Sequence, residues 1–115
     1  MYTYIELFKA KDAWLDLSDQ QKAEYLQRVG SSMEGVLASG AELVGVGGTD
    51  HGTAHEAGYD FYAVWKLPSR DVVEAFERGI EDDGWYEYFD QVNASGELVE
   101  FETLAGRIAG LTPAA

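Results

Sequence analysis

The segment YDFYAVWKLPS, residues 59–69, contains the clearest structural pattern in the chain. Aromatic and apolar side chains occupy every second position from Tyr59 to Leu67, as in a strand with one buried face. Pro68 ends that strand because it has no backbone N–H to donate, and Ser69 is a typical helix N-cap. The next apolar residues recur at helical spacing: Val72, Val73, Phe76 and Ile80. The pattern predicts a strand that passes directly into an amphipathic helix.

A long helix is predicted before this strand, over residues 19–39. Ser18 and Gln21 have the S-x-x-Q spacing of a capping box. Gly40 is a typical residue for the end of a helix. Between these limits apolar residues recur at helical spacing: Leu26, Val29, Met33, Val36 and Leu37. The caps and the spacing together indicate one amphipathic helix.

Three further strands are predicted by alternation, over residues 3–9, 41–47 and 97–103. Residues 85–89 are expected to form a short helical turn, and residues 93–96 a turn. The order of elements is then β-α-β-β-α-β. Two interleaved βαβ units of this kind give a ferredoxin-like α+β fold, whose four-stranded antiparallel sheet has the order 4-1-3-2 and helices on one face. We predict a single domain over residues 1–115, with a core at 1–103 and a tail at 104–115.

The composition indicates where the protein is expected in the cell and which kinds of chemistry it cannot use. The 115 residues are 46% hydrophobic, which is enough to fill the core of one domain. The sequence has no cysteine, which excludes disulfides, a thiolate nucleophile and cysteine-ligated metals. No apolar run approaches the length of a membrane span, and the chain begins directly with a predicted strand. We therefore expect a cytoplasmic protein.

The charge is strongly negative, with 8 Lys and Arg residues against 21 Asp and Glu residues and a net charge of −13. Such a chain repels phosphate backbones and anionic bilayers, so neither nucleic acid nor membrane is an expected partner. An acidic, solvated surface explains the charge, and so does adaptation to a salt-rich host.

The two faces of the predicted sheet have different roles. The helices are expected to cover the face with Ile5, Leu7, Phe61, Ala63, Trp65, Val99 and Phe101. The open face would then carry Tyr2, Tyr4, Glu6, Phe8, Tyr62, Val64 and Leu98. A large aromatic surface is unusual in a monomer, so the open faces of two copies are expected to stack in a homodimer. The alternative is a monomer with a partly hydrated sheet face.

The arrangement resembles the dimeric α/β-barrel superfamily, and most closely its uncharacterised bacterial families. The resemblance extends from Tyr2 to about Thr103. It depends on the order of elements, the long capped first helix and the aromatic segment at 84–89. The superfamily includes antibiotic-biosynthesis monooxygenases, muconolactone isomerases and stress-responsive barrel proteins. The resemblance implies a ligand cavity between helices and sheet or inside the barrel, and oxygenation or isomerisation without a cofactor.

The segment TDHGTAHEAGYD, residues 49–60, holds both histidines of the chain. With a nearby carboxylate, His51 and His55 could ligate zinc, iron or manganese. Gly52 and Gly58 disfavour the helix that would bring both rings to one face. Either histidine could instead act as a general acid or base. The simplest alternative is a polar loop whose histidines bond locally.

Aromatic residues are the candidate ligand-binding groups. Tyr4, Trp14, Trp65 and Trp85 are expected to line a pocket for a flat molecule, with a purely structural core as the alternative. Tyr62 or Tyr88 would orient an oxygen of the substrate.

A set of charged residues, Glu6, Lys66 and Glu100, is expected to share one sheet face. Salt bridging is its simplest role, and a catalytic acid of raised pKa is the alternative.

These observations predict a homodimeric enzyme or binding protein for a small aromatic or polyketide-like molecule. The enzymatic interpretation is a monooxygenase or isomerase in which His51, His55, Tyr62 and Tyr88 are catalytic. A non-catalytic binding or stress-associated module is the alternative. A third interpretation is a metal- or haem-dependent activity that uses His51 and His55.

Overall fold

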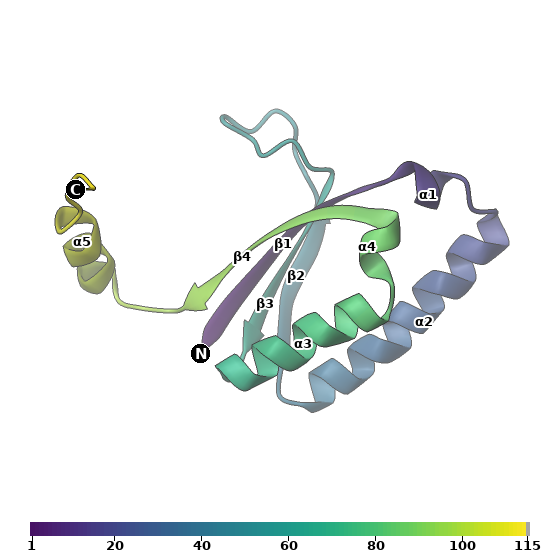
Figure 1. Ribbon diagram of the computed structural model, residues 1–115, viewed down its shortest axis with the longest axis horizontal. Helices are drawn as coiled ribbons and strands as arrows, with labels where there is room; N and C mark the ends of the chain where they lie inside the picture. Colours follow the sequence, from purple (N-terminus) through teal and green to yellow (C-terminus); the bar gives the residue numbers. More distant parts are fainter. Residues whose placement is uncertain (115) are drawn as a thin grey trace.

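The computed structural model describes residues 1–114, which build a four-stranded antiparallel sheet with two long helices along one face (Figure 1). The strands are β1 (Tyr2–Ala10), β2 (Glu42–Gly48), β3 (Phe61–Leu67) and β4 (Phe89–Glu97). The long helices are α2 (Asp19–Ala38) and α3 (Arg70–Asp82). Three shorter helices are α1 (Asp12–Leu15), α4 (Trp85–Tyr88) and α5 (Phe101–Ala109). The strand order β2-β3-β1-β4 confirms the predicted ferredoxin-like topology.

The helix α2 begins and ends where its sequence signals lie. Ser18 Oγ accepts a hydrogen bond from the Gln21 backbone at 3.1 Å, and Gln21 Oε1 accepts one from the Ser18 backbone at 2.9 Å. Gly40 follows the helix with a φ of 97°, a conformation that favours glycine. The predicted capping box is therefore confirmed.

Ser18→Ala is expected to destabilise the protein by about 1 kcal/mol, because the first turn of α2 loses its side-chain acceptor. Urea unfolding measures this loss. Ser31→Ala, which removes a mid-helix hydroxyl bonded to the Gln27 carbonyl, is the control and should change stability much less. Equal effects of the two changes would contradict the role of the cap.

The fourth strand differs from the prediction. Residues 89–97 form β4, which pairs with β1 from Tyr2↔Glu97 to Ala10↔Phe89. The predicted turn at 93–96 therefore lies inside a strand, and the predicted strand at 97–103 is wrong because α5 begins at Phe101. The polar sequence of β4 has weak strand propensity. Its pairing with β1 outweighs that propensity.

The covered face of β1 is also the reverse of the predicted one. Tyr4 and Glu6 are buried beneath the helices, opposite Trp65 and Ala63 of β3, and Tyr2 and Phe8 are partly buried beside the same core. Ile5 and Leu7 instead share the open face with Tyr62 and Val64, their neighbours in β3. The predictions that Val99 and Phe101 lie on the covered face and Leu98 on the open face are also wrong, because all three residues follow the end of β4. Both sides of β1 carry apolar residues, so alternation alone could not orient it.

The predicted charge cluster is wrong for the same reason. Glu6 points toward the helices, whereas Lys66 alternates with Trp65 and lies on the open face. Glu100 stands at the start of α5, outside the sheet. These three side chains therefore share no surface.

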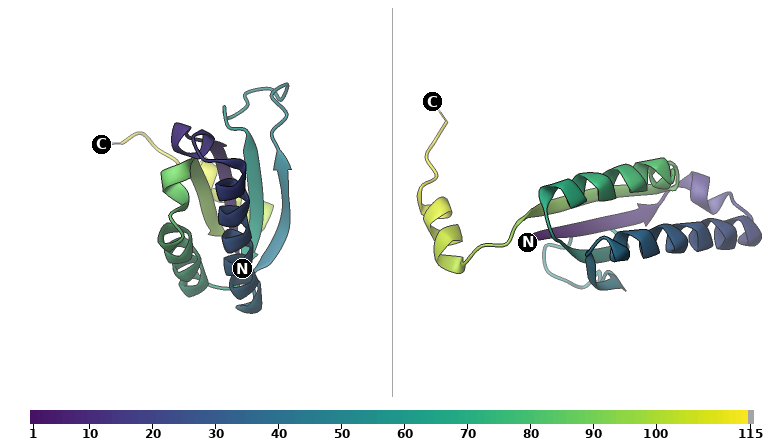
Figure 2. Two further views of the ribbon diagram at one scale, coloured as in Figure 1. Left: turned by 90° about the vertical axis from the view of Figure 1, so that its right-hand side faces the viewer. Right: turned by 90° about the horizontal axis from the view of Figure 1, so that it is seen from below.

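The core lies between the sheet and the pair α2 and α3 (Figure 2). Leu67 and Val73 are completely buried, and the rings of Tyr4 and Phe76 meet edge to face at 5.1 Å. Over residues 1–114, none of the helices combines the length and apolar composition that crossing a bilayer requires.

Candidate functional site

A cavity of about 400 Å³ lies between the sheet and helices α2 and α3. Its walls are mainly apolar and aromatic, with contributions from both helices and from β1 and β3. The principal wall residues are Phe8, Met33, Val36, Trp65, Phe76 and Ile80. Such a volume and lining are typical of a small-molecule pocket.

One carboxylate faces this apolar space. The side chain of Glu6 lies on β1, lines the cavity and belongs to a residue that is only 8% exposed. Its Oε1 accepts a hydrogen bond from Trp65 Nε1 at 2.7 Å, and its Oε2 accepts one from Gln91 Nε2 at 2.8 Å. The carboxyl group is therefore fixed in orientation by its two donors.

A chain of hydrogen bonds extends from Glu6 to the edge of the sheet. Gln91 also donates to Asn93 Oδ1 at 2.8 Å, and Gln91 Oε1 accepts from Trp85 Nε1 at 2.7 Å. Trp85 lines the cavity together with Trp65. The network thus couples both tryptophans to the buried carboxylate.

The protonation of Glu6 is shifted by its surroundings. Burial raises the pKa of the Glu6 carboxyl group, and the hydrogen bonds from Trp65 and Gln91 only partly oppose this. A carboxyl group with a raised pKa can both accept and donate a proton nearer neutral pH than an exposed glutamate. Glu6 is therefore the group in the cavity that is best placed to exchange a proton with a ligand.

Further carboxylates lie among the lining residues. Asp82 and Asp83, at the end of α3, belong to the lining of the cavity. Asp83 Oδ1 accepts a hydrogen bond from Ser32 of α2 at 3.2 Å, which joins the two helices. These charges disfavour anionic ligands and suit neutral or cationic ones.

The remaining predicted ligand-binding residues lie outside the cavity lining. Tyr4 is buried, and its hydroxyl donates to Glu77 Oε2 at 3.0 Å; burial and that carboxylate raise the pKa of Tyr4. Trp14 packs against Tyr25, Tyr88 and Phe89 in an aromatic cluster that adjoins Trp85 through Phe89. Of the predicted set, Trp65 and Trp85 are the residues that the structure brings together at the cavity.

The predicted catalytic residues are dispersed. Tyr88 belongs to the Trp14 cluster, with its ring centroid 4.8 Å from that of Tyr25. Tyr62 lies on the open face over Gly47, where an added Cβ would come within 2.6 Å of the Tyr62 hydroxyl. His51 and His55 lie on the β2–β3 loop, which contributes no side chain to the cavity lining.

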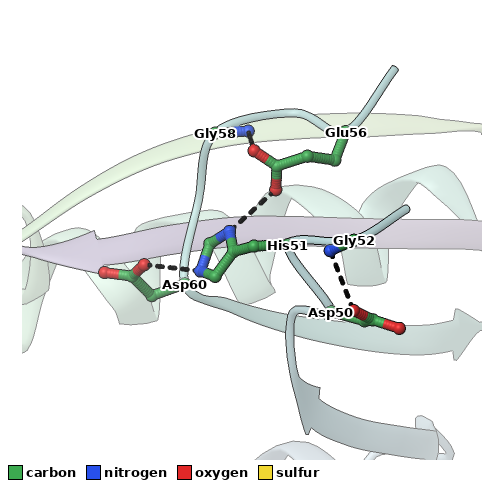
Figure 3. A network of polar contacts seen from close by, with 6 residues as sticks. All are labelled: Asp50, His51, Gly52, Glu56, Gly58 and Asp60. Carbon is green, nitrogen blue, oxygen red and sulfur yellow. Dashed lines mark hydrogen bonds and ion pairs between the residues drawn. The ribbon is translucent and has the colours of Figure 1, made fainter. Parts of the chain in front are cut away.

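His51 is held between two carboxylates (Figure 3). Its Nδ1 lies 2.9 Å from Glu56 Oε2, and its Nε2 lies 3.2 Å from Asp60 Oδ1. The hydrogen bond and charge of Glu56, with a smaller contribution from Asp60, raise the pKa of His51. In the part of the chain that the structure describes, no group of three or more His, Asp or Glu residues is arranged to hold a metal ion.

The loop should therefore be more ordered when His51 is charged. A histidine whose pKa is raised in the folded state stabilises that state at low pH, and the contribution disappears as pH rises through the raised pKa. Amide exchange in residues 49–60, corrected for intrinsic rates, should be slower at about pH 5.5 than at about pH 8.5. His51→Gln should remove this difference, whereas the control His55→Gln should keep it. A difference that persists in His51→Gln would contradict the assignment.

The fold and the cavity define a ferredoxin-like α+β protein with a pocket under its helices, and solved structures of this class are similar to the chain. A presumed chlorite dismutase is 13% identical with a TM-score of 0.63, over 93% of this chain and 48% of that one. This chain thus spans about half the length of that relative. A dimeric ferredoxin-like protein of unknown function from Thermobifida fusca is 21% identical, with a TM-score of 0.48 over 84% of this chain and 90% of that one. HapK from Hahella chejuensis is 17% identical, with a TM-score of 0.48 over 100% and 99% of the two chains.

The likeness to the first of these structures supports the ferredoxin-like fold. The chain belongs to DUF6616, a family of unknown function whose model matches residues 1–111. No curated protein matches its sequence.

Proposed function

We propose that this protein binds a small, flat, largely apolar molecule in the cavity beneath α2 and α3, and that Glu6 exchanges a proton with it. The observation that carries this proposal is the buried carboxylate of Glu6, fixed by Trp65 and Gln91 and facing a mainly apolar cavity. A carboxylate in such a position is unfavourable for stability unless it has further partners, as is common in sites that act on ligands.

The cavity favours aromatic ligands. Its volume of about 400 Å³ accommodates a molecule of two fused rings, and Phe8, Trp65 and Phe76 offer ring faces or edges to it. A hydroxyl group on such a ligand could donate to Glu6. The nearby Asp82 and Asp83 favour an uncharged ligand over an organic acid.

The reaction that fits is proton transfer. Glu6 takes a proton from a hydroxyl group or from a carbon next to a carbonyl, and returns it to another atom of the same molecule. The sum is an isomerisation, in which Glu6 ends in its starting state. Proton transfer is assigned to Glu6 instead of His51 or His55, because the loop of both histidines does not line the cavity. Binding without turnover would make the protein a binding module.

A substitution that fills the cavity tests the binding site. Gly79 lines the cavity from α3, and a Cβ at this position would meet no atom within 4 Å. Gly79→Leu should raise the Kd for 2-naphthol, a neutral two-ring phenol, by at least about tenfold, because its side chain occupies ligand space. Quenching of the fluorescence of Trp65 and Trp85 measures this binding.

The matched control is Gly30→Leu. Gly30 lies on α2, has equally free space around it and does not line the cavity. Both substitutions replace a helical glycine and should raise helix stability similarly. Equal 2-naphthol affinity in both variants would contradict the proposed binding site.

We further propose that the chain acts as a homodimer through its open sheet face. The face carries Ile5, Leu7, Tyr62, Val64 and Val92, which no helix covers. Tyr62 is 39% and Val92 44% exposed, so a contiguous apolar surface faces water in the single chain. Stacking two such faces would bury it. Analytical ultracentrifugation should find a dimer, and a monomer of 12.7 kDa at all concentrations would contradict it.

A further inference from the structure

The helix α5 stands apart from the rest of the protein. Figures 1 and 2 show it beyond the end of the sheet, separated from α2 and α3. Its large apolar side chains are exposed, with Phe101 at 78%, Ile108 at 59% and the following Leu111 at 77%. Leu104 is exposed at 44% and lies on the same stripe of the helix. Within residues 1–114, no other helix or strand covers this apolar stripe.

Such a helix needs a partner to be stable. It has 9 residues, and isolated helices of this length do not persist in water. The radius of gyration, 16.7 Å, exceeds the value of about 13 Å that is typical of a compact chain of this length. The structure therefore contains a segment whose packing partner lies outside the single chain.

The connection directs α5 away from its own sheet. The backbone N–H of Leu98 donates to the Met1 carbonyl at 3.0 Å, which continues the pairing of β4 with β1. Glu100 is extended, with φ −67° and ψ 152°. Beyond this pairing the chain continues past the end of the sheet before α5 begins at Phe101 (Figure 1). The geometry favours contact with another molecule.

The open sheet face is oriented to receive such an arm. Figure 1 shows α5 and the β2–β3 loop projecting from opposite ends of the sheet, both on the side away from α2 and α3. A second copy seated on the open face would lie between these two projections. The apolar stripe of α5 and the open sheet face of each copy would then be buried in one continuous contact.

The open sheet face is less acidic than the rest of the chain, whose net charge is −13. The helix α3 and the residue after it carry Asp71, Glu74, Glu77, Glu81, Asp82 and Asp83. On the open face of the sheet, by contrast, Lys9 and Lys66 balance two carboxylates, Asp90 and the Glu42 that lies opposite Lys66. Glu100 and Glu102 precede and open α5, so they complement these lysines. A second copy meets the least repulsion here.

We propose that α5 is an exchanged arm, which packs its apolar stripe against the open sheet side of a second copy of this chain. The inference rests on the proposed homodimer and specifies how it is held. The exposed apolar side chains of the arm and of the open face amount to on the order of 800 Å² per copy, which is the size of a standard stable interface.

Amide exchange of α5 at two protein concentrations tests the arm. An arm docked on a second copy is protected at concentrations above the Kd of the dimer and exchanges freely below it. Protection that does not change with concentration would mean docking on its own chain, and it would overturn the proposal. The absence of protection at every concentration would also overturn it, and would indicate a different partner.

Substitutions in α5 and in the open sheet face distinguish the contribution of the arm to dimer affinity from that of the sheet contact. Phe101→Asp and Ile108→Asp should each raise the Kd of the dimer about 30-fold. Thr103→Asp places the same charge on the polar side of α5 and should change the Kd no more than about twofold. Because α5 stands off the body, circular dichroism should show all three variants folded.

Val64→Asp alters the open face and leaves the arm intact. If Val64→Asp weakens the dimer while Phe101→Asp does not, the proposed exchange of α5 is contradicted and the sheet-to-sheet dimer is supported. If the wild-type chain is monomeric at every concentration, both are wrong. Neither outcome alters 2-naphthol binding, which tests the cavity separately.

Discussion

Glu6→Gln is expected to slow proton transfer in the cavity by about 10²- to 10⁴-fold, the usual contribution of a general acid or base. The amide retains the shape of the side chain but cannot take up a proton from the ligand. The measurement is deuterium exchange at C1 of 2-naphthol in D2O, followed by proton NMR. This exchange requires a proton to leave the hydroxyl group and another to reach the ring carbon. Exchange at the wild-type rate in Glu6→Gln would contradict the proposed role.

A binding measurement separates chemistry from structure. Glu6→Gln keeps the cavity, so its Kd for 2-naphthol should change much less than its exchange rate. Gly79→Leu should instead lose binding and exchange together, because the ligand is excluded. If the wild-type protein binds 2-naphthol but does not exchange it, the cavity is a binding site and the proton-transfer proposal fails for this class of ligand.

The same variant has a defined effect on the pH dependence of stability. Burial raises the pKa of Glu6 in the folded state above the value of about 4.3 for an unfolded chain. Between these two values the folded state binds more protons, so stability falls as pH rises through that window. Relative to Glu6→Gln, the wild-type free energy of unfolding should therefore decrease with rising pH from about 4. If the free energies of unfolding of the wild type and Glu6→Gln, measured in urea, change in parallel with pH, Glu6 is not buried as described.

The topology was predictable because the sequence marks where each of the two long helices, α2 and α3, begins. Ser18 and Gln21 form the expected capping box, and Ser69 accepts from the Val72 backbone at 3.4 Å where α3 begins. The alternation from Tyr59 to Leu67 placed β3, the strand between β1 and β2. Local chemistry determined these elements, so the fold class followed from them.

The site was less predictable because it depends on pairings between distant strands. Asn93 begins a segment that resembles a turn, and only the register of β4 with β1 brings the preceding Gln91 to Glu6. The sequence predicts Glu6 in a charge cluster with Lys66 and Glu100. Its side was misjudged, because Tyr4 and Ile5 are equally plausible core residues by alternation. An isolated carboxylate inside an aromatic strand is the signal that could have pointed to the cavity.

Trp85→Ala is expected to destabilise the protein by about 3 kcal/mol, toward the lower end for loss of a large aromatic because Trp85 is only partly buried. Its ring stacks on Phe89 at 4.0 Å between centroids and meets Phe8 edge to face at 5.4 Å. The change also removes the donor to Gln91 Oε1 and one wall of the cavity. Urea unfolding and 2-naphthol binding should therefore both respond.

Two further variants separate the contributions of Trp85. Trp85→Phe keeps a stacked ring and loses the indole N–H, so it should cost only about 1 kcal/mol and leave most of the affinity for 2-naphthol. Trp14→Ala removes a tryptophan from the neighbouring aromatic cluster, which lies outside the cavity lining. It should destabilise the fold without selectively weakening binding. If Trp14→Ala and Trp85→Ala weaken binding equally at temperatures where both are folded, Trp85 acts through general stability and is not a wall of the ligand site.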